Sequence, residues 1–234
     1  NEELLSFNYV ASHDLQEPLR KIQAFTNRIL DNEEEFSPTT RDYFNRVTNA
    51  ASRMQKLLEA LISYSRANNV EDDFTDVDLN DLLAEVLGDL SEMIEEKGAT
   101  VESSGLPKLK IIPTQIHQMF INLIANAIKY SRAGIPPKIK ITSQLINVED
   151  IKKPVYLHHK SYWKIAFQDN GIGFESQYED KIFELFQRLH GKNEFEGTGI
   201  GLAICKKIVQ NHNGYIFAEG RPEKGATFLI YFPA

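Results

Sequence analysis

The sequence predicts an α+β fold in two parts, a hairpin of two long helices followed by an α/β sandwich. Apolar residues recur at the helical period over most of residues 1–66. A polar, acidic stretch follows at residues 67–76. Beyond it, short alternating segments and shorter helical stretches are mixed, which is typical of helices packed on a sheet. We therefore expect a helical hairpin domain over residues 1–68 and a sandwich domain over residues 69–234.

The first predicted helix runs from near the start of the chain to about Leu30 and carries a candidate reactive histidine. Its apolar stripe consists of Leu4, Phe7, Ala11, Leu15, Leu19, Ile22, Phe25 and Ile29. His13 projects roughly 180° from the centre of this stripe, so we expect it on the outer face. Asp14 follows it directly. Pro18 cannot donate a backbone hydrogen bond to the carbonyl of Asp14, which predicts a local bend beside the histidine.

The second predicted helix begins after a break at residues 31–40 and ends near Arg66. Ser37 provides a capping hydroxyl, and Pro38 suits the first helical position. The apolar stripe of this helix consists of Phe44, Val47, Ala51, Met54, Leu58, Leu61 and Ser65. A single hairpin cannot cover both stripes, whereas pairing with a second copy into a four-helix bundle would. We therefore expect a homodimer.

The second part of the chain is expected to form one sheet with helices over one face. The predicted strands are residues 74–79, 99–104, 108–112, 138–148, 162–168, 214–220 and 226–232. The predicted helices are residues 80–97, 113–130, 176–186 and 198–213, the second of them opened by Pro113.

Composition and charge exclude several classes of protein. The net charge of −7 argues against a general nucleic-acid binder. A single cysteine, Cys205, excludes an intrachain disulfide and fits a reducing compartment. The sequence has no apolar run of about 18 residues and no secretory signal, so we expect a cytoplasmic region. The chain opens in what already looks like helix, which predicts a fragment whose membrane attachment, if it has one, lies in missing upstream parts.

Two stretches of the second part carry side chains suited to a ligand. In QMFINLIANAIKYS, residues 118–131, Asn122 and Asn126 lie four apart and share one face of an otherwise apolar helix. Their amide oxygens suit a hard cation such as Mg²⁺. DNGIGF, residues 169–174, directly follows a predicted strand. Gly171 and Gly173 allow positive φ and close approach of the backbone to a ligand, and Asp169 is placed to accept a hydrogen bond from it.

A third stretch, EGTGIGLAICKKIV at residues 196–209, is suited to an anion. Gly197, Gly199 and Gly201 enter a predicted helix and offer backbone N–H groups at its positive end. The stretch is not a dinucleotide fingerprint, because the polar loop RLHGKNEFE takes the place of the preceding strand. It is not a P-loop either, because no GK[ST] ends it.

Together and in this order, these stretches resemble the N box and the glycine boxes of sensor histidine kinases. IFELFQRLH at residues 182–190 resembles the intervening phenylalanine box, and GATF at residues 225–228 the last glycine box. HDLQEPLR at residues 13–20 is similar to the histidine box of the family. The sequences of these motifs most resemble those of the phytochrome-like branch. The resemblance implies a dimeric four-helix bundle and an ATP-binding domain of the type shared by gyrase, Hsp90, histidine kinases and MutL.

The resemblance also implies roles for single residues. His13 resembles the phosphoacceptor, Asp14 the acidic neighbour that holds its ring proton, and Arg188 the lid cation near the γ-phosphate. Asn126 matches the Mg²⁺ ligand. The nucleotide-binding set is Asn122, Asn126, Lys129, Tyr130, Asp169, Gly171, Gly173, Gly197, Thr198, Gly199, Gly201, Leu202 and Thr227. The implied activity uses ATP and Mg²⁺ to phosphorylate His13, and then passes the phosphoryl group to an aspartate in the receiver domain of a response regulator.

Several alternatives stay open at this point. An ATPase of the same fold could act without phosphorylating itself, and a dimeric scaffold could bind ATP poorly. HDLQEPLR argues against the first alternative, and the intact asparagine and glycine boxes argue against the second. The basic residues Arg20, Lys21 and Arg28 suit either a docking patch or a solvated helix face. Glu17 stands where the family commonly has threonine or asparagine, which predicts weak or absent phosphatase activity.

Overall fold

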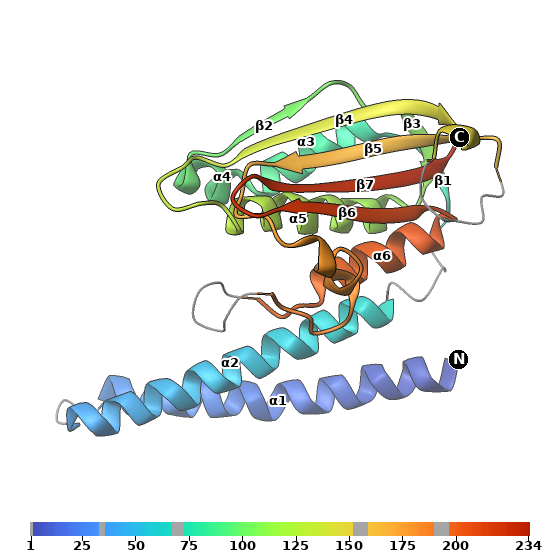
Figure 1. The fold of residues 1–234 in the computed structure, drawn as a ribbon. Helices are drawn as coiled ribbons and strands as arrows, with labels where there is room; N and C mark the ends of the chain where they lie inside the picture. The colour runs from blue at the N-terminus through green and yellow to red at the C-terminus, as the bar shows by residue number, and fades with distance from the viewer. Residues whose placement is uncertain (1, 33–35, 67–72, 152–158, 190–196) are drawn as a thin grey trace. The chain divides into compact units, whose positions relative to one another are not determined.

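The computed structural model describes residues 2–32, 36–66, 73–151, 159–189 and 197–234, with side chains of the first helix described from Leu15 onward. The chain divides into two compact units, Asn1–Arg66 and Ala67–Ala234 (Figure 1). Most of the predicted acidic linker, residues 67–72, lies outside the described residues. Over the part of the chain that is described, no helix is both long and apolar enough to cross a bilayer.

The first unit is the predicted helical hairpin. Helix α1 spans Glu2–Asn32 and continues through Pro18, and helix α2 spans Pro38–Arg66. The Ser37 hydroxyl accepts a hydrogen bond from the Thr40 backbone N–H at 3.1 Å, which satisfies one donor of the first turn. The capping residue and the proline start of α2 are therefore confirmed.

The interior of the hairpin is narrow. Leu19 and Ala51 are buried, and Gln23 Nε2 donates a hydrogen bond to Gln55 Oε1 across the two helices at 3.1 Å. Much of both predicted stripes remains exposed in the single chain, namely Leu15, Ile22, Phe25, Ile29, Val47, Met54 and Leu61. Exposed apolar residues repeated along one face of each helix are typical of an interaction surface.

The second unit contains a five-stranded sheet in the order β2-β4-β5-β7-β6. Its strands are β2 (Thr100–Ser103), β4 (Lys138–Asn147), β5 (Ser161–Asp169), β6 (Tyr215–Arg221) and β7 (Gly225–Pro233). The pair β2–β4 is parallel and the other pairs are antiparallel. Strands β1 (Thr75–Asp78) and β3 (Lys108–Ile111) form a separate antiparallel ribbon, so the expectation of one sheet is corrected.

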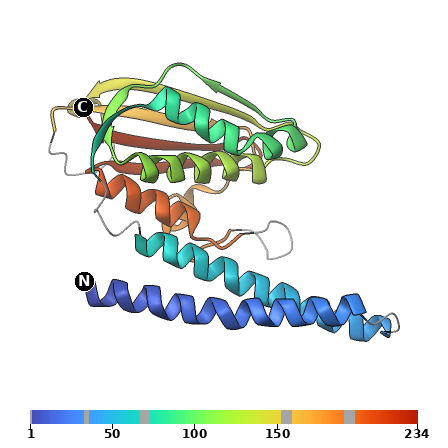
Figure 2. The same ribbon diagram turned by 180° about the vertical axis from the view of Figure 1, so that it is seen from behind.

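Three helices cover one face of the sheet, as Figures 1 and 2 show from opposite sides. They are α3 (Leu79–Asp89), α5 (Pro113–Lys129) and α6 (Gly201–Asn211). The ring centroids of Phe120 on α5 and Phe167 on β5 lie 5.2 Å apart in the core between these layers. The α+β sandwich predicted from the sequence is confirmed.

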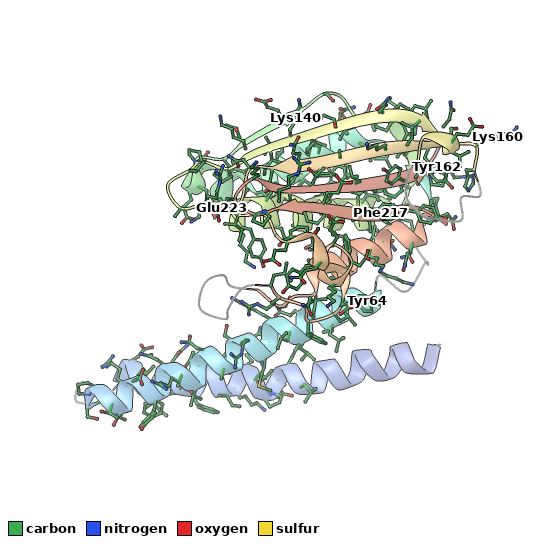
Figure 3. All side chains as sticks on the ribbon, in the orientation of Figure 1. Tyr64, Lys140, Lys160, Tyr162, Phe217 and Glu223 are labelled. Atoms are coloured by element: carbon green, nitrogen blue, oxygen red, sulfur yellow. The ribbon has the colours of Figure 1, made fainter. Side chains whose placement is uncertain are left out.

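The other face of the sheet is also apolar in part. Tyr162, Leu229 and Tyr231 form a buried cluster, against which the partly buried Phe217 packs. Figure 3 shows Tyr162 on β5 and Phe217 on β6. The Tyr162 hydroxyl accepts a hydrogen bond from the His159 backbone N–H at 3.3 Å. Strand β7 is therefore largely buried on both faces, which explains its nearly continuous apolar sequence.

Two predicted helices of this unit differ from the structure. The stretch 80–97 forms two helices, α3 and α4 (Ser91–Lys97), because the chain leaves helical geometry at Leu90, with φ −96° and ψ 7°. Gly88, a weak helix former, lies just before this break. The second helix ends at Gly98, whose φ of +58° is the left-handed conformation common after helices.

The stretch 176–186 forms two short 3₁₀ turns, η2 (Ser176–Tyr178) and η3 (Lys181–Phe183), where an α-helix was expected. Its buried residues Ile182 and Phe183 are adjacent, whereas an α-helix would place neighbours on different faces. Helix α6 begins at Gly201, three residues later than expected, because Gly199 has a φ of +73° that no right-handed helix contains.

Candidate functional site

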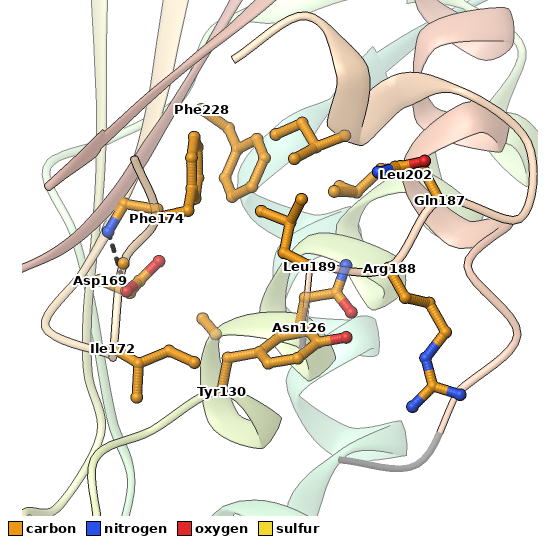
Figure 4. A pocket seen from close by; sticks show the side chains of 14 residues that line it. Asn126, Tyr130, Asp169, Ile172, Phe174, Gln187, Arg188, Leu189, Leu202 and Phe228 are labelled. Carbon is orange, nitrogen blue, oxygen red and sulfur yellow. Dashed lines mark hydrogen bonds between the residues drawn. The ribbon is translucent and has the colours of Figure 1, made fainter. Parts of the chain in front are cut away.

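A hollow in the second unit lies between the end of α5, the loop after β5, the start of α6 and strand β7 (Figure 4). Its empty volume is about 640 Å³, part of which is open to solvent. Its walls are formed by Asn126, Ala127, Tyr130, Asp169, Ile172, Gly173, Phe174, Ile182, Gln187, Arg188, Leu189, Leu202, Ala226 and Phe228. A mainly apolar lining with a few polar groups is typical of a small-molecule site.

Asp169 is the partly buried acidic group of the hollow. It ends β5, and its Oδ1 accepts hydrogen bonds from the backbone N–H groups of Gly171 at 2.8 Å and Ala226 at 3.1 Å. Burial raises the pKa of the Asp169 carboxyl, and these two hydrogen bonds lower it in part. A carboxylate held in such a place is costly for folding, which points to a ligand that donates to it.

The loop after β5 can pack only because it contains glycine. Gly173 has a φ of +62°, and a Cβ there would overlap the Arg221 carbonyl oxygen. A Cβ on Gly171 would lie 2.5 Å from the Tyr130 carbonyl oxygen, and the same oxygen accepts the Ile172 backbone N–H at 2.9 Å. The loop is thereby attached to the end of α5, and Asp169 faces the hollow from this support.

The end of α5 supplies further polar groups to the hollow. Asn126 and Tyr130 line it. Lys129 Nζ lies 3.2 Å from the Tyr130 hydroxyl and 4.5 Å from the centroid of that ring. A Cβ on Gly197 would collide with Lys129 Nζ, so the first glycine of the third motif leaves room for this ammonium group.

Asn122 lies one helical turn before Asn126 and has a different environment. Its Nδ2 donates a hydrogen bond to the Gly201 carbonyl oxygen at 3.3 Å, and it does not line the hollow. Asn122 therefore joins α5 to the first residue of α6. The next residue of α6, Leu202, does line the hollow.

The segment before α6 is held by a glycine contact. Gly199 would place a Cβ 2.8 Å from the Gln187 carbonyl oxygen and from the Phe186 carbonyl carbon. Phe186 itself has a φ of +63°. Gln187, Arg188 and Leu189 follow it and line the hollow, with Arg188 and Asp169 on different sides in Figure 4. His190 and residues 191–196 lie outside the described residues.

Strand β7 corrects one predicted contact. Ala226 and Phe228 line the hollow, and Thr227 lies between them in an extended strand. Because side chains alternate across a strand, Thr227 faces the other side of the sheet. Its predicted contact with nucleotide does not fit this geometry. The alternation along GATF could have indicated Ala226 and Phe228 in its place.

The structure brings part of the predicted set together. The residues that line the hollow are Asn126, Tyr130, Asp169, Gly173, Arg188 and Leu202. Those in adjoining segments are Asn122, Lys129, Gly171, Gly197, Thr198, Gly199 and Gly201. The backbones of His13 and Asp14 lie in α1 of the other unit, and their side chains lie outside what is described. The sequence reasoning missed the apolar walls, Ile172, Phe174, Ile182 and Phe228, because it searched for polar groups.

The helix that carries His13 also carries the departure from the family pattern. Glu17 Oε1 lies 2.6 Å from Lys21 Nζ, and both side chains are more than half exposed. The effect of Glu17 on a phosphatase reaction stays a prediction.

Comparison with known proteins agrees with this arrangement. Residues 111–234 match the family model described as "Histidine kinase-, DNA gyrase B-, and HSP90-like ATPase". Residues 3–70 match the "His Kinase A (phospho-acceptor) domain". The chain therefore belongs to this ATPase family, and the two models together place it among the sensor histidine kinases.

Individual relatives support the same class. The phytochrome-like protein Cph1 of Synechocystis sp. is 36% identical over all of this chain, which spans 29% of that protein. The structure of histidine kinase ThkA in complex with response regulator protein TrrA is 25% identical, with a TM-score of 0.59 over 99% of this chain and 63% of that one. Full-length ShkA in complex with AMPPNP shares the fold, at 23% identity and a TM-score of 0.67, over 99% of this chain and 45% of that one.

Proposed function

We propose that this chain is the catalytic region of an ATP-dependent protein-histidine kinase that phosphorylates its own His13 and then an aspartate of a response regulator. The observation that carries the proposal is the partly buried Asp169 carboxylate lining a mainly apolar hollow, on a chain whose residues 3–70 match a phosphoacceptor domain. The chain spans less than a third of Cph1, so the activity of the whole protein is part of the proposal.

The proposed nucleotide site assigns a task to each wall of the hollow. Asp169 accepts a hydrogen bond from the amino group of adenine, and Ile172 and Phe228 pack against the base. Lys129 contacts phosphate oxygens, as do the backbone N–H groups of residues 197–201 near the positive end of α6. The ShkA complex, which contains the ATP analogue AMPPNP, supports nucleotide binding by this fold.

The residues present fit a magnesium ion as well. The Asn126 side chain lines the hollow, and its carbonyl oxygen is a hard ligand of the kind that Mg²⁺ takes together with phosphate oxygens and water. We assign Asn126 as the protein ligand. A bound Mg²⁺ would supply neutralisation of the triphosphate charge.

The proposed reaction needs little covalent help from the protein. A neutral ring nitrogen of His13 attacks the γ-phosphorus, an N–P bond forms, and the bond from phosphorus to the ADP oxygen breaks. Asp14 holds the proton on the other ring nitrogen and stabilises the positive imidazole that forms. Arg188 stabilises charge on the transferred group. An aspartate of the regulator then accepts the phosphoryl group, and the ThkA–TrrA complex supports a partner of this type.

The proposal includes a homodimer and a cytoplasmic setting. The exposed apolar stripe of α1 and α2 supports the dimer, because pairing two hairpins would bury it. The ATP that the reaction consumes supports the setting.

Incubation with γ-labelled ATP and Mg²⁺ tests this function against its alternatives. Acid-labile, base-stable label is expected on the wild type and on His159→Gln, which changes an exposed histidine of the other unit, but not on His13→Gln. Turnover of ATP without label on the wild-type protein would favour an ATPase that does not phosphorylate itself. Neither label nor turnover would favour a scaffold. Transfer of label to a panel of receiver domains tests the second step.

A further inference from the structure

A cluster of hydrogen bonds at the Asp169 end of the hollow is centred on Arg132, which follows α5 and does not line the hollow. Nε of this half-buried side chain donates to the Asn170 carbonyl oxygen at 2.9 Å. Its Nη1 donates to the Glu223 carbonyl oxygen at 2.9 Å. One guanidinium group therefore joins the end of the α5 segment, the loop after β5 and the turn between β6 and β7.

The side chain of Asn170 holds the same loop from another direction. Its Oδ1 accepts the Lys138 backbone N–H at 2.8 Å, and its Nδ2 donates to the Pro136 carbonyl oxygen at 3.1 Å. The residue next to Asp169 is thus fixed at its carbonyl by Arg132 and at its side chain by the start of β4. This leaves the peptide that carries Asp169 little freedom to rotate.

The turn that Arg132 holds also supports the loop directly. The Glu223 backbone N–H donates to the Ile172 carbonyl oxygen at 2.7 Å. A Cβ on Gly225 would overlap the Asp169 carbonyl oxygen, so the turn and the loop are in close contact. Separation of the turn from the loop would therefore move Asp169 as well as the wall formed by Ile172.

We propose that Arg132 is a positioning residue for recognition of the base. By holding the Asn170 and Glu223 carbonyl oxygens together, it fixes the direction in which the Asp169 carboxylate meets the amino group of adenine. The inference rests on the proposed function, because it takes adenine as the partner of Asp169. Hydrogen-bond recognition depends on donor and acceptor direction, so a small rotation of Asp169 reduces selectivity even while the protein stays folded.

The test compares ATP with inosine triphosphate, which has an oxygen where ATP has the amino group. We expect Arg132→Ala to bind ATP about 5- to 20-fold more weakly than the wild type, the effect of one or two lost hydrogen bonds. Its affinity for inosine triphosphate changes little, so the ratio of the two affinities falls. Arg132→Lys keeps the charge but cannot reproduce the planar fork to both carbonyls, so its ratio falls too.

Lys224→Ala is the matched control, because it removes one positive charge at an exposed position in the turn between β6 and β7, which Arg132 contacts. It is expected to keep the wild-type ratio. Calorimetric titration gives the dissociation constants, and thermal unfolding shows whether each variant is folded. If Arg132→Ala does not fold, Arg132→Lys carries the comparison.

A folded Arg132→Lys protein that discriminates ATP from inosine triphosphate as the wild type does overturns the inference and leaves the proposed function standing. Equal affinity of the wild type for the two nucleotides also overturns it, since Asp169 would then not recognise the amino group. A wild-type protein that binds neither nucleotide removes both proposals.

Discussion

Asp169 combines a folding cost with its proposed task in recognition. Burial raises the pKa of its carboxyl above the ordinary 3.8, so its ionisation opposes folding as the pH rises through the folded-state pKa. Asp169→Asn keeps an oxygen for the Gly171 and Ala226 N–H groups without the charge. We expect this variant to unfold at a higher urea concentration than the wild type at pH 7.5. The difference should disappear below about pH 3.8, where the side chain at position 169 is uncharged in both proteins.

Asp169→Asn should also bind ATP more weakly than the wild type. An amide nitrogen facing the amino group of adenine puts two donors together, and loss of a hydrogen bond to a charged acceptor costs roughly 2 kcal/mol, or about 30-fold in dissociation constant. Urea titration and ATP titration measure the two effects. A variant that is less stable at pH 7.5 and binds ATP normally would contradict this account of Asp169.

His212 is a buried histidine with a structural task. Its Nε2 accepts the Ile112 backbone N–H at 3.0 Å, so the ring proton lies on Nδ1, which donates to the Ile208 carbonyl oxygen at 2.7 Å. The rings of Phe74 and Phe232 lie beside it. Burial lowers the pKa of His212 below 6.5. The neutral ring is therefore the form that the folded protein requires.

The stability of the wild type should therefore fall as the pH drops through about 6.5, because the unfolded chain takes up a proton that the folded His212 does not. His212→Phe should lose roughly 1–3 kcal/mol at pH 7.5, the cost of leaving the Ile112 N–H unpaired. It should also show a smaller decline between pH 6.5 and 5. Urea unfolding at a series of pH values checks both effects, with His159→Phe as the exposed control. An unchanged decline in His212→Phe would refute this assignment.

At the residue scale, the sequence predicts groups whose chemistry is local. Asp169 and Asn126 could be found because a carboxylate after a strand and an amide in an apolar helix are unusual in themselves. Arg132 and His212 could not be found, because three of their four backbone partners lie 38 to 100 positions away in the chain. Only the folded structure brings such groups together. The partners of Arg132 are carbonyl oxygens, which every residue has, so side-chain identity gives no indication of them.

At the scale of elements, Gly199 connects the segment before α6 to residues that line the hollow. Its φ of +73° disfavours any other residue, and a Cβ would contact the Gln187 carbonyl oxygen at 2.8 Å. Gly199→Ala should cost about 1–2 kcal/mol of stability and displace the segment 187–189. We expect roughly 10-fold weaker ATP binding, the fold-change that matches a loss of about 1.4 kcal/mol.

Gly88→Ala provides the matched control for this change. Gly88 lies in α3, and a Cβ there meets nothing within 4 Å. Alanine at this position should stabilise the protein by about 0.5–1 kcal/mol and leave ATP affinity unchanged. Equal ATP affinity of Gly199→Ala and Gly88→Ala, measured by titration, would show that the Gly199 contact does not position the pocket wall.

The elements that the sequence predicts well are those with long and regular periodicity. Helices α1, α2 and α5 have apolar stripes over several turns. The starts of α2 at Pro38 and of α5 at Pro113 follow from the fixed φ of proline. The stretch 176–186 is too short for periodicity to decide, and its apolar residues pack through tertiary contacts. The ribbon β1–β3 was missed as a separate sheet because strand pairing between distant segments leaves no local trace.

At the scale of the whole molecule, the exposed apolar surface of the hairpin indicates a binding partner. The sequence could predict the type of partner, a second copy of the chain. Stripes on both helices predict that these faces are buried by a partner, and a second copy would supply a matching surface. In the proposed dimer, the path of the chain between α1 and α2 would decide whether His13 receives phosphate from its own subunit or from its neighbour. Residues 33–35 of that path lie outside the described part, and periodicity carries no information on handedness.

Substitution at the stripe tests the dimer directly. Phe25 is 62% exposed in the single chain, and burying it in an interface would contribute roughly 2 kcal/mol from each copy. Phe25→Ser should therefore raise the dimer dissociation constant about a thousandfold. Lys56 is exposed on the opposite face of α2, so Lys56→Ser should leave association unchanged. Sedimentation equilibrium should give twice 26.7 kDa for the wild type and Lys56→Ser, and a concentration-dependent lower mass for Phe25→Ser. A wild-type mass of one chain at micromolar concentration would mean that something other than a second copy covers this face.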